Sequence, residues 1–568
     1  MVTRIRFFVA LPFSQARLVR RICAALALAL SGIVMAEPWQ LDPAFGLGGK
    51  TAISIVRFSN TLKALAVAPD GKILAAAVCL TDAGIGTSCL ARLDASGKLD
   101  ASFNGSGKVV STNPESLGTM GMALQADGKI VLAGVCRNIV SLHDDFCVTR
   151  YQVSGALDTT FNGTGKQITH VAGFTNGIAT SVLIQPDGRI VLGGYCSDAD
   201  AASFCMVRYS ANGTLDAAFG FQGIVATPKV IGEFNRIVGL TLQSNGKLVA
   251  AGSCGGQVGL DHTFCISRYE SNGSLDGQFG NGGKVSTLIG TSASDPKPIA
   301  LVSDGRFVVA GECQGQTNVE FCMARFTVDG LLDSTFGAAG SVTASVLVGS
   351  RHYNARVEVQ SDGKLVIGGN CGFGIGSSAC LVRTHGDGAI DLSFGQNGRV
   401  TSTFLIDDTR LNSMVLLPDG TILVGGLCGS GIIYSFCLNR LKAGDYPPPF
   451  CGLSIDLDES AGSATGALLV TRYLLGYRGD ALVAGVLGQS STLVGQALLN
   501  YLGSLKLDAD GDGKALAMTD GLLMLRAMLG LTGDALTRRA TNSSHPNVRN
   551  AQQILAWIAD THGAACLP

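Results

Sequence analysis

Aspartates gather in one stretch near the C-terminus, in the segment LDADGDGKALAMTD that ends at Asp520. Asp508, Asp510 and Asp512 alternate along this segment, and Gly513 follows directly. Calcium-binding loops place oxygen ligands at positions one, three and five, a glycine at position six and a late carboxylate. The spacing therefore predicts a calcium site. The alternative is an exposed acidic loop in which Asp520 only caps the following helix.

The stretch around this loop occurs twice. Residues 465–482 (TGALLVTRYLLGYRGDAL) match residues 519–536 (TDGLLMLRAMLGLTGDAL), and both copies carry leucines at helical spacing. A duplicated loop and helix of this kind resembles type I dockerin modules, over residues 451–568 only. The resemblance implies a small all-α calcium-binding domain and a cohesin-like partner. The calcium ligands that it implies are Asp508, Asp510, Asp512, Lys514 through its backbone carbonyl, and Asp520.

Two features depart from that family. Asp520 is thirteenth in the loop, where the family has its closing ligand at the twelfth position. The first copy lacks the needed glycine and the last aspartate, so we expect weak or no metal binding there. Its equivalent positions are Ser454, Asp456, Asp458, Glu459 and Gly466. Cys451 and Cys566 bracket the domain, and we expect a disulfide between them.

Histidine and aspartate stand together twice, as His143-Asp144-Asp145 and as Asp261-His262, each shortly before a cysteine. Such groups could bind a metal or transfer protons, and the alternative is that they are solvated loop residues. The chain shows no nucleophile motif, phosphate-binding loop or dinucleotide fingerprint. We therefore assign no catalytic and no cofactor-binding residues from the sequence.

Fourteen of the 17 cysteines form closely spaced pairs. If each pair flanks a hairpin loop, its members oppose each other on antiparallel strands, within the Cα distance that a disulfide needs. Zinc binding is the alternative, but the pairs have no partnering histidines. The predicted disulfides are Cys79–Cys89, Cys136–Cys147, Cys196–Cys205, Cys254–Cys265, Cys313–Cys322, Cys371–Cys380 and Cys428–Cys437. Seven disulfides favour an oxidising compartment.

These pairs belong to an internal repeat. Its L-D-x-x-F element has aspartates at Asp42, Asp100, Asp158, Asp216, Asp276, Asp333 and Asp391. An arginine follows the second cysteine of each pair at Arg92, Arg150, Arg208, Arg268, Arg325, Arg383 and Arg440. A turn of the type D-G-K or D-G-R precedes each pair, with two variants. We expect the aspartate to bond its own turn, and the arginine to pair with it or to reach solvent.

Each copy contains four apolar runs of strand length and no helical period. Asp-Gly between two apolar runs is a strong hairpin signal. Four antiparallel strands repeated seven times predict an all-β seven-bladed propeller, since stacked blades bury both faces of every sheet. The composition agrees, with 46% hydrophobic and only 15% charged residues.

The motifs PDGKI, G-G or A-G, Cys-x-x-Arg and L-D-x-x-F-G occur in this order and resemble the bacterial delta-60 repeat family, across about residues 41–442. That family implies a fold and no catalytic residues. The strand order is similar to that of NHL-type propellers, whose innermost strand precedes the D-G turn. In that order residues 41–54 form a strand without a blade, and the last copy lacks its fourth strand. We therefore expect the N-terminal strand to complete the seventh blade.

The predicted domains are a signal peptide at 1–36, the propeller at 37–442, a proline-rich linker at 443–450 and the dockerin-like domain at 451–568. The signal has arginines, an apolar core too short to suit a membrane anchor, and a cleavage site at Ala36. It holds five of the 42 basic residues and none of the 43 acidic ones, so the rest carries a charge near −6. No basic stripe indicates nucleic-acid binding.

The sequence favours an exported bacterial protein, either secreted, periplasmic or on the cell surface. We expect a non-catalytic binding or adhesive scaffold whose protein or glycan ligand lies on the face with the variable loops. Only Trp39 and Trp557 could stack on sugars as indole rings, which disfavours a typical lectin. The alternatives are a propeller hydrolase or lyase with its site at the central mouth, and a structural envelope or matrix protein.

Overall fold

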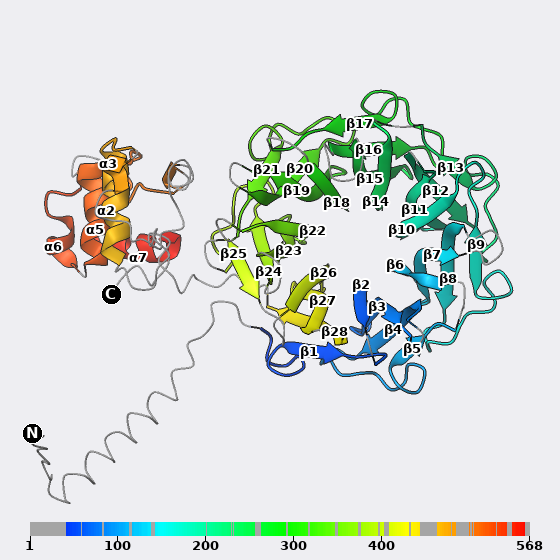
Figure 1. Cartoon of the computed structure of the whole chain (residues 1–568). Coiled ribbons are helices and arrows are strands. Elements are labelled where there is room, and N and C mark those ends of the chain that lie inside the picture. The colour runs from blue at the N-terminus through cyan, green and yellow to red at the C-terminus, as the bar shows by residue number, and fades with distance from the viewer. Residues whose placement is uncertain are drawn as a thin grey trace, which may run out of the picture.

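The computed structural model gives a ring of strands and a separate group of helices (Figure 1). The residues that it describes are 41–57, 59–81, 84–112, 116–137, 143–199, 201–228, 230, 232–255, 263–290, 294–315, 318–346, 350–372, 377–395, 398–402, 408–430, 433–442, 463–478, 480–483, 499, 502–503, 505–529, 531–541 and 548–562. Several expectations lie outside these residues: the signal peptide, the linker, the Cys451–Cys566 bridge, the Asp261-His262 pair and most of the first-copy loop.

The strands recur in one order along the chain. The innermost strands are β2 (Asn60–Val67), β6 (Ser116–Leu124), β10 (Asn176–Ile184), β14 (Phe234–Leu242), β18 (Ser294–Leu301), β22 (His352–Val359) and β26 (Asp408–Leu416). The second strands are β3 (Ile73–Leu80), β7 (Ile130–Arg137), β11 (Ile190–Ser197), β15 (Leu248–Gly255), β19 (Phe307–Gln314), β23 (Leu365–Cys371) and β27 (Ile422–Ser430). The third strands are β4 (Gly86–Leu93), β8 (Asp144–Tyr151), β12 (Ala202–Tyr209), β16 (Thr263–Tyr269), β20 (Val319–Phe326), β24 (Ser378–Thr384) and β28 (Ile433–Leu441). The outer strands are β5 (Lys108–Val110), β9 (Lys166–Thr169), β13 (Ile224–Ala226), β17 (Lys284–Thr287), β21 (Ser341–Ala344), β25 (Arg399–Ser402) and, from the N-terminal end, β1 (Lys50–Ile53).

Consecutive strands pair antiparallel within each set of four, so the fold is an all-β, propeller-like one. We number these sets repeats 1 to 6, from β2–β5 through β22–β25, and call β26–β28 with β1 repeat 7. The innermost strands of neighbouring repeats contact one another, and β26 contacts β2, so the contacts run around a complete circle (Figure 1). The innermost strand precedes the D-G turn, as the resemblance to NHL-type propellers predicts.

The N-terminal strand joins the last repeat. β1 pairs antiparallel with β28, with Lys50 opposite Asn439 and Ile53 opposite Phe436. The amide of Asp42 also donates to the carbonyl of Arg440 at 2.8 Å. The predicted pairing of residues 41–54 with the end of the last copy is therefore confirmed, and the edge of β28 is covered.

Apolar side chains between adjacent repeats form the core. The phenylalanine of every L-D-x-x-F element is fully buried, and burying one such side chain stabilises the fold by roughly 1.5–3 kcal/mol. These residues are Phe45, Phe103, Phe161, Phe219, Phe279, Phe336 and Phe394. The second strands are almost wholly buried, because both of their faces pack against neighbouring repeats.

The seven predicted disulfides of the repeats are all present, with Cα–Cα distances of 5.3–6.1 Å, which rules out the zinc alternative for these cysteines. Their register differs from our expectation. In repeat 3, Cys196 is opposite Ser203, and Cys205 is opposite Gly194. The bonded cysteines are thus diagonal rather than directly opposed, on the same face of the hairpin.

Gly194 lies next to a β-bulge in the innermost strand β10. The register of β10 shifts between Ala179 and Ser181, and the same shift occurs at this level in the other innermost strands. A Cβ atom on Gly194 would lie 1.8 Å from the carbonyl oxygen of Ile178. The second glycine of the G-G motif is therefore required because the bulged strand approaches its backbone. The bulged residue Thr180 donates to the carbonyl of Ile237 in the next repeat at 2.6 Å.

The C-terminal helices are α2 (Ser463–Leu474), α3 (Asp480–Val483), the π-helix η1 (Ala517–Gly521), α5 (Leu522–Met528), α6 (Gly533–Thr537) and α7 (Ala551–His562). The two copies of the duplicated segment lie together, because α2 contacts both η1 and α5. Buried residues of this group include Leu469, Leu523, Met524 and Ile558. In the described part of the chain, no helix has the length and apolar character needed to cross a membrane.

Candidate functional site

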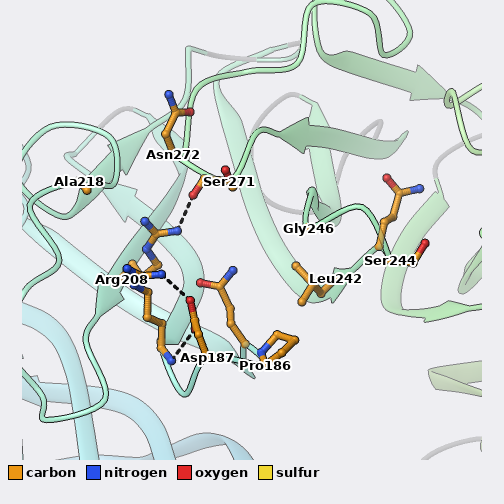
Figure 2. A pocket seen from close by; sticks show the side chains of 12 residues that line it. Pro186, Asp187, Arg208, Ala218, Leu242, Ser244, Gly246, Ser271 and Asn272 are labelled. Carbon is orange, nitrogen blue, oxygen red and sulfur yellow. Dashed lines mark hydrogen bonds and ion pairs between the residues drawn. The ribbon is translucent and has the colours of Figure 1, made fainter.

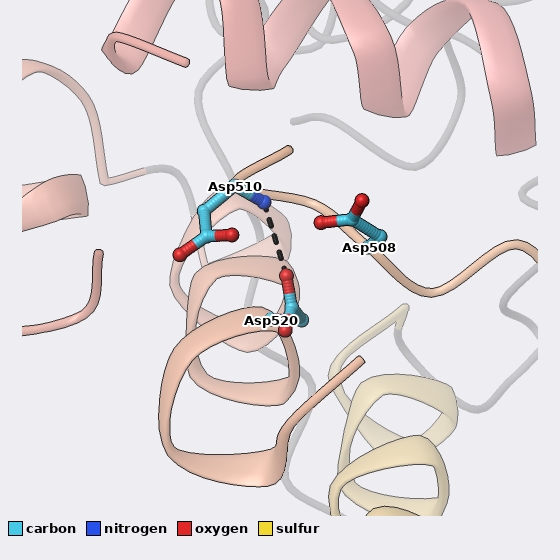
Figure 3. A group of neighbouring side chains, drawn as sticks. All are labelled: Asp508, Asp510 and Asp520. Carbon is cyan, nitrogen blue, oxygen red and sulfur yellow. Dashed lines mark hydrogen bonds between the residues drawn. The ribbon is translucent and has the colours of Figure 1, made fainter. Parts of the chain in front are cut away.

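Three carboxyl groups of the predicted calcium loop come together (Figure 3). Ligand oxygens of Asp508, Asp510 and Asp520 all lie within 4.8 Å of one another, and Asp510 and Asp520 are fully buried. The amides of Gly511 and Gly513 donate to the two oxygens of Asp508, at 2.8 and 3.1 Å. Gly513 has a φ of 87°, the left-handed conformation that glycine adopts without strain. The loop therefore curls around the point where the carboxyl groups meet.

Asp520 reaches the cluster although it is thirteenth in the loop. The π-helix η1 contains it, and the amide of Gly521 donates to the carbonyl of Leu516, five residues earlier, at 3.2 Å. A π turn holds one residue more than an α turn, so the extra position is absorbed. The amides of Asp510 and Leu516 then donate to the two oxygens of Asp520, at 3.0 and 2.8 Å.

Asp512 and Lys514 are placed differently. The carboxylate of Asp512 accepts a hydrogen bond from the amide of Lys514 at 2.9 Å. The close group consists of Asp508, Asp510 and Asp520, without Asp512. Three of the five predicted ligands are therefore assembled. The contribution of Asp512 and of the Lys514 carbonyl stays a prediction.

The electrostatics of the loop suit a cation. Burial raises the pKa of Asp520, and the neighbouring carboxylate of Asp510 raises that pKa further. The guanidinium of Arg549 donates to the carbonyls of Asp508 and Ala509, at 2.7 and 3.2 Å. A divalent ion among the carboxylates would offset their mutual repulsion, and hard oxygen ligands are those that calcium prefers. The residues present therefore fit a calcium ion.

The repeating arginine and aspartate form an ion pair in every repeat. In repeats 1 to 6 the distance from arginine Nε to aspartate Oδ2 is 2.6–2.9 Å, and in repeat 7 Arg440 pairs with Asp42. Each guanidinium lies over the phenylalanine ring of the same element, 4.4–4.9 Å from its centroid. Of the two expectations for the arginine, pairing is therefore confirmed.

These arginines also connect the repeats. Nη1 of Arg150 donates to the carbonyl of Ala211 in the next repeat at 2.6 Å, and Arg208 bonds Ser271 in the same way. Arg440 of repeat 7 bonds the carbonyl of Ala95 in repeat 1. Groups that recur in this way act as inter-repeat links, and their chemistry is used in the fold.

Ionisable side chains also lie on the innermost strands. Burial lowers the pKa of Lys63 on β2 and lowers the pKa of Arg356 on β22 to about 10. Burial raises the pKa of Glu358, also on β22, to about 7. Nε of Arg356 donates to the carbonyl of Asn412 at 3.0 Å, and Nδ2 of Asn412 donates to the carbonyl of Leu62 at 3.0 Å.

The histidine and aspartates of repeat 2 have partners that the sequence did not indicate. Asp145 pairs with Nδ1 of His170 at 2.7 Å, and Asp144 pairs with Arg137 at 2.8 Å. His143 stacks on His170, with 5.4 Å between ring centroids. Sequence reasoning missed His170 because it follows the outer strand, 25 residues beyond Asp145. The pairing orients one imidazole beside a buried carboxylate.

Two cavities lie on the face that carries the D-G turns, which we call the turn face. They lie between repeats 2 and 3 and between repeats 3 and 4, with volumes of about 830 and 680 Å³. Figure 2 shows the second, with Pro186 and Asp187 on one side, Ser271 and Asn272 on the other, and Arg208 between them. The variable loops of the opposite face lie partly outside the described residues, and the predicted ligand surface there stays a prediction.

Six segments of the chain match the model of a family described as "Domain of unknown function (DUF5122) beta-propeller". They are residues 68–103, 125–161, 185–219, 243–279, 303–336 and 360–394. Each match runs from the residues before the D-G turn to the phenylalanine of L-D-x-x-F. The chain thus carries repeats of a β-propeller repeat family. No curated protein matches the chain.

Solved structures are similar to the chain at low sequence identity. The chain is similar to virginiamycin B lyase from Staphylococcus aureus, with a TM-score of 0.39 and 11% identity over 69% of this chain and 98% of that one. It is similar to the β-propeller domain of the Trilobed protease from Pyrococcus furiosus, with a TM-score of 0.34 and 10% identity over 70% and 99%. It also resembles a puromycin-hydrolyzing peptidase from Mycobacterium tuberculosis, with a TM-score of 0.40 and 11% identity over 68% and 52%. These likenesses concern the fold alone.

Proposed function

We propose that this chain, whose repeats belong to a β-propeller repeat family, is an exported non-catalytic scaffold that binds or adheres to a partner. One observation supports this function above the others. The polar residues that recur in the repeats are used in ion pairs and in bonds to the next repeat, as Arg150 is with Asp158 and Ala211. Such links give a rigid ring that holds surface loops in fixed positions, which is what a binding scaffold needs.

The proposed arrangement is seven blades of four strands in one ring, with residues 37–442 as the propeller and the variable loops as the ligand face. Those loops differ in length and composition between repeats, whereas the turns on the opposite face follow one pattern. Variation confined to one face of a regular scaffold is typical of a recognition surface. A protein or a glycan ligand is consistent with it.

The C-terminal region, residues 451–568, is proposed to be a dockerin-like calcium module that docks to a cohesin-like partner. The support comes from the alternating aspartates, the duplication and the convergence of Asp508, Asp510 and Asp520. Export is proposed from the N-terminal arginines and apolar run at residues 1–36. The seven disulfides favour an extracellular or otherwise oxidising destination.

The test is affinity capture by the purified full chain from secreted and envelope fractions, with calcium or with a chelator. We expect a partner that is retained only with calcium, and calcium should raise the melting temperature. Asp520→Asn should weaken calcium binding at least tenfold and abolish that capture, because it removes charge from the buried cluster. Asp534→Asn, at an exposed position of α6, is the matched control and should change neither.

Two results would contradict parts of the scaffold proposal. If nothing is retained in either condition and the purified chain turns over glycosides or esters, the protein is an enzyme. Calcium-independent capture would refute the docking module while leaving the propeller surface as the binding site.

One observation favours the enzyme as the second candidate. Glu358 lies on an innermost strand, and burial raises its pKa to about 7, a value suited to a general acid or base at neutral pH. In that case Glu358→Gln should abolish turnover of glycosides or esters, whereas the exposed Asp362→Asn should not.

A further inference from the structure

One residue that lines the cavity between repeats 3 and 4 differs from its equivalents in four other repeats. In four repeats, Nη2 of the repeating arginine donates to a hydroxyl two residues after the paired aspartate. These hydroxyls belong to Ser102, Thr160, Thr335 and Ser393, at 3.0–3.3 Å. In repeat 3 the residue at this position is Ala218, and Ala218 lines the cavity. Arg208 therefore lacks the hydroxyl that its counterparts have (Figure 2).

In the described part of the chain, the hydrogen bonds of Arg208 use Nε and Nη1 but not Nη2. Nε bonds Asp216 at 2.8 Å, and Nη1 bonds the carbonyl of Ser271. Arg268 and Arg440, which also lack the hydroxyl, direct Nη2 to carboxylates of Asp329 and Asp42. Within the described residues, Nη2 of Arg208 has no such partner. Its side chain is only 6% exposed, so this donor meets solvent only through the cavity that it lines.

A hydrogen-bond acceptor near Arg208, Oε1 of Gln185, is also without a partner among the described residues. Gln185 is more than nine-tenths buried. In the neighbouring repeats, the equivalent Gln125 and Gln243 accept from their own arginines, at 3.4 and 3.5 Å. Oε1 of Gln360 is also unpartnered, but Nη2 of its arginine is taken by Ser393. Gln185 lines the cavity that contains Arg208, with its Oε1 buried behind the cavity wall, so an unpaired acceptor lies next to the site of the unpaired donor.

The charges around this cavity cancel. Asp216 pairs with both Arg208 and Arg189, at 2.8 and 3.0 Å, and Arg189 also pairs with Asp187. Two cations thus stand against two carboxylates, which gives no preference for an ionic ligand. Apolar surface comes from Pro186, Leu242 and Ala218. The volume of about 680 Å³ is in the range of small-molecule sites.

We propose that this cavity binds a neutral saccharide. A sugar hydroxyl can accept from Nη2 of Arg208. Rotation of the Gln185 side chain would bring its buried Oε1 to the cavity, where it can accept from the same hydroxyl or from a neighbouring one. The C–H face of the ring packs on Pro186 and Leu242, in place of an aromatic platform. This site lies on the turn face, so it is separate from the partner surface proposed above and does not depend on it.

The substitution Ala218→Ser tests the proposal without weakening the fold. The new hydroxyl would occupy Nη2 of Arg208, as Ser393 occupies that of Arg383, so the ligand loses its donor. Titration calorimetry of the full chain with glucose, galactose, mannose and cellobiose should show binding of at least one sugar. Ala218→Ser should weaken that binding at least tenfold, with an unchanged or higher melting temperature. Gln185→Leu should weaken it to a similar degree.

Thr160→Ala is the matched control, because it removes the equivalent hydroxyl in repeat 2. It should lower the melting temperature and leave sugar affinity at the repeat 3 cavity within twofold. The proposal is overturned if none of the four sugars binds below about 10 mM, or if Ala218→Ser binds as well as the native chain. Tighter binding of glucuronate or of a neutral tripeptide than of every neutral sugar would also overturn it. Capture of a protein partner by the loop face would be unaffected by any of these results.

Discussion

Replacing Asp158 by asparagine removes one charge from an inter-repeat link and leaves the shape of the side chain unchanged. Arg150 and Asp158 are 6% and 0% exposed at their side chains, and Nε lies 2.7 Å from Oδ2. The carboxylate also accepts from the hydroxyl of Thr160 and from Nε2 of Gln152, both at 2.6 Å. The amide of Thr160 also donates to Oδ1 at 3.2 Å, and Nζ of Lys129 lies 3.5 Å from Oδ2. The guanidinium in the variant stays buried without its counter-charge.

The cost follows from this burial. Breaking a buried pair by removing one partner typically costs about 3–5 kcal/mol, because the remaining charge is desolvated without compensation. For a ring of about 400 residues, a loss of 3 kcal/mol corresponds to a fall of roughly 4 °C in melting temperature. Asp127→Asn in the same repeat is the control, because its pair with Lys129 is exposed and is worth under about 1 kcal/mol.

The pH dependence provides the decisive measurement. Burial alone would raise the pKa of Asp158, but the hydrogen bonds from Thr160 and the charge of Arg150 lower it below the ordinary value. A carboxyl whose pKa is lowered by folding stabilises the fold above its unfolded pKa and loses this contribution as pH falls. Thermal melts with intact disulfides should therefore separate the native chain from Asp158→Asn at pH 7, and the difference should shrink as the pH falls below the ordinary aspartate pKa of 3.8. A difference at pH 7 no larger than that of Asp127→Asn would refute the reasoning.

Two further predictions concern the innermost strand β22 and the second strand β11. Glu358→Gln should stabilise the chain by roughly 1–3 kcal/mol at pH 8 and by little at pH 4. The reason is that burial raises the pKa of Glu358 to about 7, so that ionisation of this carboxyl group opposes folding above that pH. Urea unfolding at the two pH values measures the difference, and equal effects at both would contradict the prediction. Gly194→Ala should destabilise the chain by about 3 kcal/mol or more, because the new Cβ would clash with the carbonyl of Ile178. Gly277→Ala, with open space around it, should be nearly neutral. Expression yield and melting temperature of the two variants test this, and a Gly194→Ala variant as stable as the native chain would contradict the bulge argument.

Much of the ring could be predicted from the sequence, because its determinants repeat. The spacing of the L-D-x-x-F elements, the D-G turns and the paired cysteines are local patterns that each copy confirms for the others. The pairing of Cys196 with Cys205 followed from this, but its diagonal register did not. The register between β11 and β12 depends on where the chain turns between these strands, and the residues between the two cysteines do not mark that point. The second glycine of G-G was visible, yet its reason lies in a strand next to it in space.

The two candidate sites were also only partly predictable from the sequence. The calcium loop was predicted from residue types, but the thirteenth position of Asp520 looked like a fault until the π-helix explained it. The signal for the cavity at Arg208 was present in the sequence as Ala218, where four of the other repeats have serine or threonine. Its meaning required the knowledge that this hydroxyl bonds the arginine. A missing side chain is informative only after the structure gives the partner that it leaves unpaired.

The direction of the arginine links explains why the N-terminal segment belongs to the last repeat. In repeats 1 to 6 each arginine pairs with an aspartate that follows it in its own repeat, so a row of such repeats leaves one unmatched arginine at its end. Arg440 is that residue, and it takes its aspartate and its phenylalanine ring from Asp42 and Phe45. Its second bond goes to Ala95 of repeat 1, which makes the ring continuous. Loss of residues 41–53 would therefore leave the buried guanidinium of Arg440 unpaired and expose the edge of β28. The ring is thus closed by the same kind of contacts that join neighbouring repeats.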